Sequence, residues 1–400
     1  MRIGVVNFDP MRLAQALDFK LKTKAALAKS IGASTSVLAC YLNGSRKPSP
    51  ENFEKIADAL EFPKKFFLTP QALDGYNESL KLWRSLSSRK TADTRKGEVI
   101  MSWMAEIHRI FNAVFDLPIY KMNEEIDSWG LPSDISQITV DVAEDAASRV
   151  RACWNLGKLP IKNLLRTVEK AGIVVGRFNL NVPQLDAVST FYKGRPYILL
   201  NSFKESGCRA RFDLAHEIGH LVLHRHVSKE DFSGENGKEI YQKLEQQAHW
   251  FAGALLLPAD RFTSDFWAPT FQCFVDMKEK WKVSIQAMIR RGLTLELLTE
   301  NQYNWLNIAI SKKKARQVEP LDDKITPERI RLFPKCFERY EEEFGIESMP
   351  ELLEKLPFPK DILVELMSLN DNDIERFING QSKNKENIIY IDFIRKFNNT

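Results

Sequence analysis

The spacing of apolar residues predicts a mainly helical protein with one short β-sheet. Over most of the chain apolar positions recur at intervals of three and four residues, as on the buried face of a helix. Residues 173–201 differ, because "IVVGRF" and the segments "AVSTFY" and "PYILLN", which flank a Gly-containing turn, have the β-branched and aromatic character of strands. The predicted fold class is therefore α+β.

Breaks in this pattern divide the chain into four parts. We predict an N-terminal helix-turn-helix bundle, a helical connector, an α+β unit and a helical C-terminal region of unknown role, over residues 8–70, 71–142, 143–315 and 316–400. Within them, the polar stretch 87–98 is predicted to be a linker, and 319–328 a further boundary. Residues 159–172 are predicted to form a helix with Pro160 near its start and Gly172 at its end.

The amino-acid composition indicates a globular protein and little more. The chain is 44% hydrophobic and 28% charged, and no apolar run approaches the roughly 20 residues of a membrane-spanning helix. The start has no secretory-signal pattern, so we expect a cytoplasmic protein, and the five dispersed cysteines are expected to be reduced. Residues 1–70 hold 11 Lys or Arg against 6 Asp or Glu, a net charge of +5 that permits contact with nucleic acid.

Chemistry concentrates in "AHEIGHLVLHRH" at residues 215–226, which contains four of the six histidines. On a helix His216 and His220 lie one turn apart on one face, so both imidazoles can bind one metal ion, for which Zn²⁺ is the expected choice. Glu217 then points to the side where water attacks a carbonyl, and can act as the general base. The competing interpretation, a polar stripe of unrelated histidines, fits this spacing poorly in a chain so poor in histidine.

A catalytic zinc needs a third protein ligand, and three residues compete for that position. His226 has the spacing of a longer histidine motif, but Leu223 stands where that motif needs a Gly to reverse the chain, so we expect the helix to continue. His224 is expected at the rim of the site. Glu245, on the predicted helix "KLEQQAHWFAGALLLP", is the preferred candidate, with His249 one turn later as a polar support for it.

These two motifs resemble the ImmA/IrrE family of bacterial zinc metallopeptidases. The similarity rests on "RFDLAHEIGHLVLH" and "LEQQAHWFAGALLLP" and extends over roughly residues 145–315. It implies a small gluzincin-like metallopeptidase fold, zinc held by His216, His220 and Glu245, Glu217 as general base, and a DNA-binding repressor as protein substrate. The chain departs from the family at His249, where Asn or Asp is usual, and at Gln247, where a second Glu is common. Neither departure removes a ligand.

The N-terminal block has the signals of a helix-turn-helix. Thr23 and Ser34 are placed to cap successive helices around Gly32, and Ser49 to cap a later one that begins with proline. The block resembles the Xre-type domain of phage-repressor-like regulators, which binds double-stranded DNA. The early residues of the second helix would face base edges and a following group would contact phosphates; they are Thr35, Ser36 and Ala39, and Asn43, Arg46 and Lys47.

Together these features predict a zinc-dependent endopeptidase coupled to a DNA-binding domain. The expected role is cleavage of a repressor-type regulator in a stress, mobile-element or phage-defence response, with a homodimer reading an operator. Two alternatives use the same sequence differently. In one, a transcription regulator uses the peptidase fold as a sensor or dimerisation platform without proteolysis. In the other, an antitoxin-like binder uses a helical N-terminal block that has lost DNA binding to sequester a partner.

Overall fold

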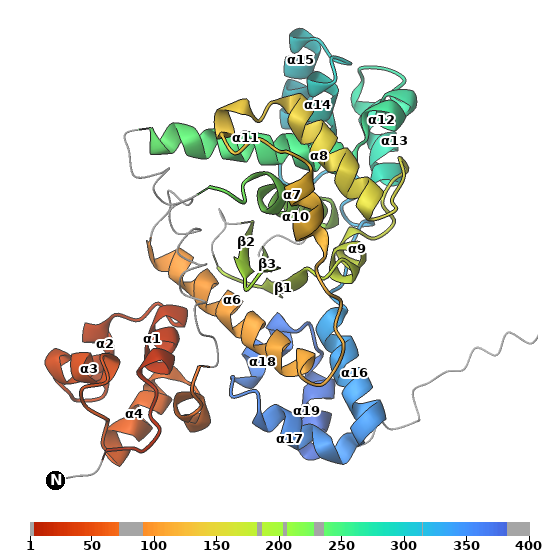
Figure 1. The fold of residues 1–400 in the computed structure, drawn as a ribbon. Helices are drawn as coiled ribbons and strands as arrows, with labels where there is room; N and C mark the ends of the chain where they lie inside the picture. The colour runs from red at the N-terminus through yellow and green to blue at the C-terminus, as the bar shows by residue number, and fades with distance from the viewer. Residues whose placement is uncertain are drawn as a thin grey trace, which may run out of the picture.

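The computed structural model describes residues 4–71, 91–181, 186–202, 206–227, 236–313 and 315–381 (Figure 1). Helices make up most of the described chain, and the strands form a single three-stranded sheet near its centre. The α+β, mainly helical class predicted from the sequence is confirmed.

The first part is a helical bundle formed by α1 (Pro10–Phe19), α2 (Lys24–Ser30), α3 (Thr35–Leu42), α4 (Pro50–Leu60) and the 3₁₀ helix η1 (Lys64–Leu68). As predicted, the side chains of Thr23, Ser34 and Ser49 accept backbone N–H bonds at the starts of α2, α3 and α4. Gly32 has φ of +67° in the turn between α2 and α3, a conformation that glycine adopts without steric cost.

A long helix, α6 (Thr91–Asn112), corrects the prediction of a polar linker at 87–98. Residues 91–98 are its first turns, and 87–90 lie outside the described residues. The stretch is helical despite its polarity because the rest of the protein supplies its partners. The ammonium group of Lys96 lies 5.2 Å from the ring centre of Phe19 and 5.7 Å from that of Phe178, and Glu98 is buried.

Buried polar contacts fix the N-terminal bundle on α6. Arg12 of α1 forms an ion pair of 2.6 Å with Glu106, and both side chains are almost fully buried. Gln15 accepts a bond of 3.1 Å from the indole N–H of Trp103 and donates one of 3.3 Å to Ser102. Because a buried charge is costly without its partner, these contacts specify one docking of the bundle against the remainder of the chain.

The sheet consists of β1 (Val174–Phe178), β2 (Ala187–Tyr192) and β3 (Arg195–Asn201) in the order β1-β3-β2. β3 pairs in parallel with β1 and antiparallel with β2, so β2 occupies one edge. The two strands predicted around a Gly-containing turn are confirmed as an antiparallel hairpin, and its turn places Lys193 and Gly194 at φ of +48° and +76°.

The sheet separates two hydrophobic cores. Val174 and Leu199 belong to the core shared with α6 and the C-terminal helices, whereas Val175, Ile198 and Leu200 belong to the core shared with the central helices. The central helices are α7 (Met122–Ser128), η2 (Ile135–Gln137), α8 (Val140–Cys153), α9 (Leu164–Lys170), α10 (Gly207–Leu223), α11 (Gly237–Leu256), α12 (Ala259–Asp265), α13 (Phe271–Trp281), α14 (Ile285–Thr294) and α15 (Glu300–Lys312). Both faces of the strands are thus covered, which explains their nearly continuous apolar sequence.

The helix predicted over 159–172 begins later than expected. α9 starts at Leu164, with Asn163 as its capping residue, and Pro160 precedes it. The guanidinium group of Arg151 donates hydrogen bonds of 2.7 and 2.6 Å to the carbonyl oxygens of Gly157 and Leu159, which holds this segment in an irregular conformation. The predicted stop is confirmed, since Gly172 has φ of +85°.

The described C-terminal region is helical, with α16 (Leu332–Phe344), η4 (Ile346–Ser348), α17 (Met349–Glu354), α18 (Lys360–Leu366) and α19 (Asp371–Asn379) packed beside α6 (Figure 1). Residues 319–328, predicted to be a boundary, are packed against the central helices. Glu319 is buried in an ion pair with Lys278 of α13, and Glu328 pairs with Arg211 of α10.

Among the described residues no single helix has the length and apolar character to cross a bilayer, and only the bent pair α2 and α3, taken together, meets that criterion by length and composition.

Candidate metal centre

The two motif helices, α10 and α11, lie against each other and place their polar side chains at one point. Ser206 caps α10, and His216, Glu217 and His220 follow in its second half. A Cβ atom on Gly219 would lie 3.1 Å from the ring of Phe251 and 3.2 Å from the backbone of Ala248. The glycine of the "HEIGH" stretch therefore permits the close helix contact that brings Glu245 beside the two histidines.

Three side chains converge as a tripod. The Nε2 atoms of His216 and His220 are 3.0 Å apart. The carboxylate oxygens of Glu245 lie 3.4 Å from the first nitrogen and 3.5 Å from the second. Burial raises the pKa of Glu245, but the neighbouring rings of His216 and His220 lower it further, so it lies well below its usual range. The group is therefore an ionised carboxylate facing two imidazoles.

These distances fit a zinc ion. A tetrahedral zinc with bonds of about 2.0–2.2 Å holds its ligand atoms roughly 3.3–3.6 Å apart, close to the separations found here. Two imidazole nitrogens and one carboxylate oxygen are also a donor set typical of zinc sites that keep one position open. The tripod is partly accessible, because the Glu245 side chain is 34% exposed.

Glu217 lies beside the tripod and does not belong to it. It is only 8% exposed, and its Oε2 atom accepts a hydrogen bond of 2.5 Å from the hydroxyl of Ser189 on the edge strand β2. This contact fixes the carboxylate next to the two histidines. Sequence reasoning missed Ser189, because a serine within a strand pattern carries no signal that it meets a residue 28 positions away.

His224 occupies a different position from the one predicted. α10 ends at Leu223, so the helix does not continue as Leu223 suggested, and His224 is its C-terminal cap. The side chain is buried instead of lying at the rim. Its Nδ1 atom is 2.9 Å from Nδ1 of His220, and its Nε2 atom is 3.0 Å from Oε1 of Gln247. The His224 ring therefore supports a candidate ligand from behind.

This chain of hydrogen bonds determines which nitrogen of His220 is free. The side-chain NH₂ of Gln247 donates to the carbonyl oxygens of Ile135 and Ile138, so its oxygen faces His224 as an acceptor. Burial keeps the pKa of His224 well below its usual value, so its ring is neutral, with the proton on Nε2. Nδ1 of His224 then accepts the proton of His220 Nδ1, which leaves the His220 Nε2 lone pair directed into the tripod.

Replacing Gln247 with alanine is expected to weaken zinc binding by about 10–100-fold, because His224 then has no acceptor to fix its tautomer. Competition with a chromophoric chelator measures the change in affinity. The matched control is Gln246→Ala, since Gln246 is the exposed neighbour on the same helix. Equal affinities of the Gln247→Ala and Gln246→Ala proteins would refute this role.

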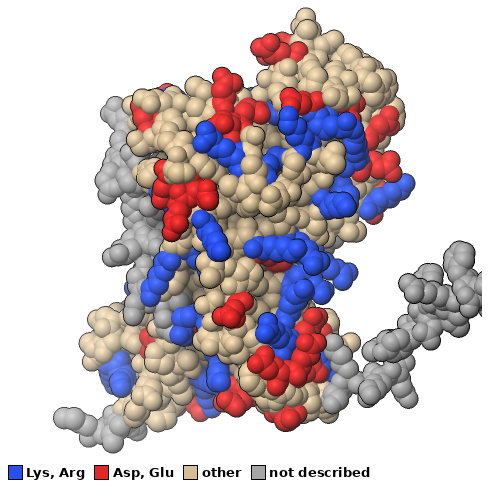
Figure 2. Space-filling view, turned by 45° about the vertical axis from the view of Figure 1, so that its right-hand side comes forward, with Lys and Arg blue, Asp and Glu red and all other residues tan. Residues whose placement is uncertain are grey.

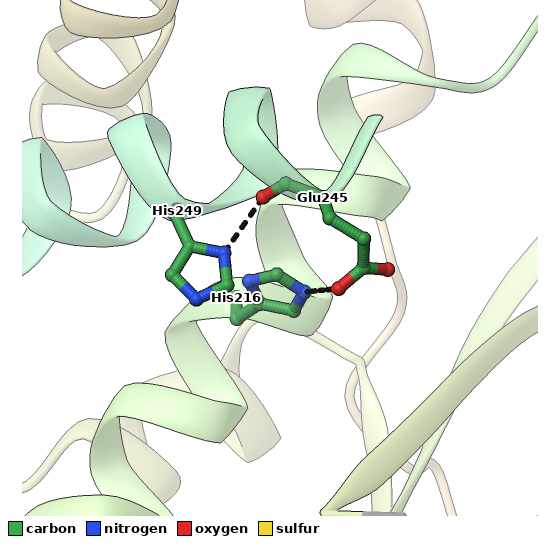
Figure 3. A group of neighbouring side chains, drawn as sticks. All are labelled: His216, Glu245 and His249. Atoms are coloured by element: carbon green, nitrogen blue, oxygen red, sulfur yellow. Dashed lines mark hydrogen bonds and ion pairs between the residues drawn. The ribbon is translucent and has the colours of Figure 1, made fainter. Parts of the chain in front are cut away.

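His249 and His226 differ sharply in their relation to the site. His249 packs edge-on against His216, with ring centres 4.5 Å apart, and its Nδ1 atom is 2.7 Å from the backbone oxygen of Glu245 (Figure 3). It thus contacts the main chain of Glu245 and not its carboxylate. Ligand atoms of His216, Glu245 and His249 all lie within 4.8 Å of one another, so His249 stands close enough to be a further donor. His226 is exposed in the turn after α10.

All six residues predicted to contact DNA are exposed. They lie on α3 and in the loop after it, and they are Thr35, Ser36, Ala39, Asn43, Arg46 and Lys47. The Asn43 side chain accepts bonds from the backbone and hydroxyl of Ser45, which shapes the loop. Arg46 and Lys47 form no ion pair within the described part of the chain. Their charges are therefore available to phosphates.

Comparison with protein families agrees with both halves of this description. Residues 168–292 match the M78 peptidase family, described as the IrrE N-terminal-like domain, and residues 13–67 match a helix-turn-helix family. No curated protein shows significant similarity to the chain. The chain therefore contains an IrrE N-terminal-like domain, of a family that is generally metal-dependent, behind an N-terminal Xre-type helix-turn-helix domain.

Proposed function

We propose that this protein is a zinc-dependent endopeptidase coupled to a DNA-binding domain, and that it cleaves a repressor-type regulator in a stress, mobile-element or phage-defence response. The observation that carries the proposal is the convergence of His216, His220 and Glu245 with Glu217 buried beside them. The two family matches support the same combination of domains.

The residues of the tripod would hold the metal, and Glu217 would handle protons. When bound, zinc supplies a Lewis acid that polarises a carbonyl group and lowers the pKa of water. Glu217 is the base that accepts a proton from the attacking water and returns it to the leaving amine. Its hydrogen bond from Ser189 keeps the carboxylate oriented for both transfers.

The direct test is incubation of the zinc-loaded full chain with repressor-type proteins of its host, followed by mass spectrometry of the products. We expect one substrate to be cut at a defined peptide bond. Failure of a zinc-loaded protein to cut any of them would favour the alternative, a regulator or antitoxin in which the peptidase fold is an interaction platform. The buried contacts between the N-terminal bundle and α6 are compatible with either role.

The DNA-binding part of the proposal predicts a change in salt dependence. An Arg46→Ala/Lys47→Ala double variant should bind its operator more weakly, and the slope of log K against log salt should fall by about 0.9 for each phosphate that the variant no longer neutralises. Fluorescence anisotropy at several salt concentrations measures both quantities. A Lys55→Ala/Lys64→Ala variant removes two exposed charges that pair with Glu51 and Glu54, away from α3, and serves as the control. An unchanged slope in the first variant would contradict the assigned face.

A homodimer is also proposed, because operators read by helix-turn-helix domains are usually two half-sites bound by two copies of the domain.

A further inference from the structure

A pocket of about 500 Å³ lies away from the metal centre, beside α9. Its walls come from three separate segments, which are the chain after α6 at 115–118, α9, and α16. None of the candidate metal ligands lines it. Its volume is in the range of about 300–1,000 Å³ that is usual for sites binding small molecules.

Positive charge gathers on two of these walls. Arg166 and Lys170 lie one turn apart on α9, while Arg331 and Lys335 stand at the start of α16. All four side chains are exposed, and none has an ion pair with any residue that the structure describes. Figure 2 shows Lys and Arg side chains gathered where the upper and lower parts of the molecule meet.

This arrangement works against the stability of the empty protein. Like charges one helical turn apart repel each other, and a second pair of like charges lines the same pocket. Four carboxylates also line the pocket, and they belong to Asp116, Glu169, Glu338 and Glu342. The buried one, Glu169, is already used, because its Oε1 atom accepts bonds of 2.9 Å from the backbone N–H groups of Arg331 and Leu332. Four cations that form no ion pair with any described residue, set around one pocket, are suited to an anionic ligand.

The rest of the lining is suited to a nucleoside. Phe115, Leu117 and Pro118 provide an apolar wall, and the guanidinium group of Arg339 lies 5.2 Å from the ring centre of Phe115. Glu169 is only 6% exposed, and this burial raises the pKa of its carboxyl group. Glu342 lies further along α16 than Lys335, where a carboxylate can accept hydrogen bonds from ribose hydroxyls.

We propose that this pocket binds a nucleoside diphosphate, with its phosphates held by Arg166, Lys170, Arg331 and Lys335 and its base against the apolar wall. The four cations supply the charge-assisted hydrogen bonds that phosphate oxygens accept. The inference does not depend on the peptidase activity, because no residue of the metal centre takes part.

Isothermal titration calorimetry of the full chain with ADP tests the proposal, with adenosine and inorganic pyrophosphate as partial probes. ADP should bind more tightly than either probe, because only ADP has both the phosphates for the four cations and the base for the apolar wall. A Lys170→Ala/Lys335→Ala variant should bind ADP at least tenfold more weakly. A Lys121→Ala/Lys162→Ala variant, which removes two exposed charges outside the pocket, should bind it as the unaltered protein does.

Three results would overturn the assignment. The first is that the protein binds neither ADP, GDP nor their monophosphates. The second is that the Lys170→Ala/Lys335→Ala variant binds ADP as tightly as the unaltered protein. The third is that the four cations bind duplex DNA but no free nucleotide. Misfolding does not explain weaker binding by that variant, because it removes exposed like charges, so its melting temperature should equal or exceed that of the unaltered protein without ligand. ADP should raise the melting temperature of the unaltered protein and leave that of the variant nearly unchanged.

Discussion

Replacing Glu217 with glutamine is expected to lower the rate of substrate cleavage on the order of 10²–10⁴-fold while zinc remains bound. The amide has the shape of the carboxylate and can still accept a hydrogen bond from Ser189, but it cannot take a proton from water. Since Glu217 lies beside the tripod of His216, His220 and Glu245, the change should affect the rate and not the metal content. Mass spectrometry of the cleavage products over time measures the rate.

The control for this change is Glu239→Gln, which makes the same substitution at an exposed position in the first turn of α11. It should cleave at the unaltered rate. Cleavage by the Glu217→Gln protein at the control rate would remove Glu217 from the mechanism. If the Glu217→Gln protein no longer cleaves its substrate but still regulates its operator normally, the peptidase fold would be better described as a platform for interaction.

Replacing Lys278 with methionine is expected to lower the free energy of unfolding by about 3–5 kcal/mol. The ammonium group of Lys278 is fully buried and forms ion pairs of 2.8 Å with Glu319 and 2.7 Å with Asp322. Glu319 is itself buried and also accepts a bond of 2.7 Å from the backbone N–H of Ile285. Without the lysine, a buried carboxylate is left without its counter-charge, and residues 319–322 are no longer held against α13 and α14.

Urea unfolding followed by tryptophan fluorescence measures this destabilisation, because Trp281 lies in α13 near Lys278. Lys280→Met is the matched control on the same helix, since Lys280 forms a more exposed ion pair with Asp265. Pairs near the surface contribute only about 0–1 kcal/mol. Equal stabilities of the Lys278→Met and Lys280→Met proteins would show that the buried pairs do not hold this part of the fold.

The candidate site could be predicted where it depends on spacing along one helix. His216 and His220 follow from a separation of four residues, and Glu245 follows from its position on a second apolar-faced helix. The environment of these residues could not be predicted in this way. Ser189 and Gln247 reach the site only because β2 and α11 pack against α10, and no local pattern contains that information.

The errors in the predicted fold also come from contacts between residues that are distant in the sequence. Residues 91–98 have the composition of a linker, yet they form a helix because Lys96 packs against the aromatic rings of Phe19 and Phe178, which are distant in the sequence. Residues 319–328 have the composition of a boundary, yet buried partners in α10 and α13 hold them in place. The caps and the turn of the N-terminal bundle were predicted correctly, since Ser34 and Gly32 act on their immediate neighbours.

The most direct test of the proposed metal centre is the zinc content of the purified protein and of its His216→Ala, Glu245→Ala and His226→Ala variants, measured by elemental analysis. We expect about one zinc per chain in the unaltered protein, as for a single site of this kind, with no zinc in the first two variants and full zinc in the third. His226 is the appropriate control because it belongs to the same histidine cluster but is exposed beyond the end of α10. An unaltered protein that holds no metal after zinc has been offered, or one that releases its zinc only when His226 is replaced, would contradict the proposed centre.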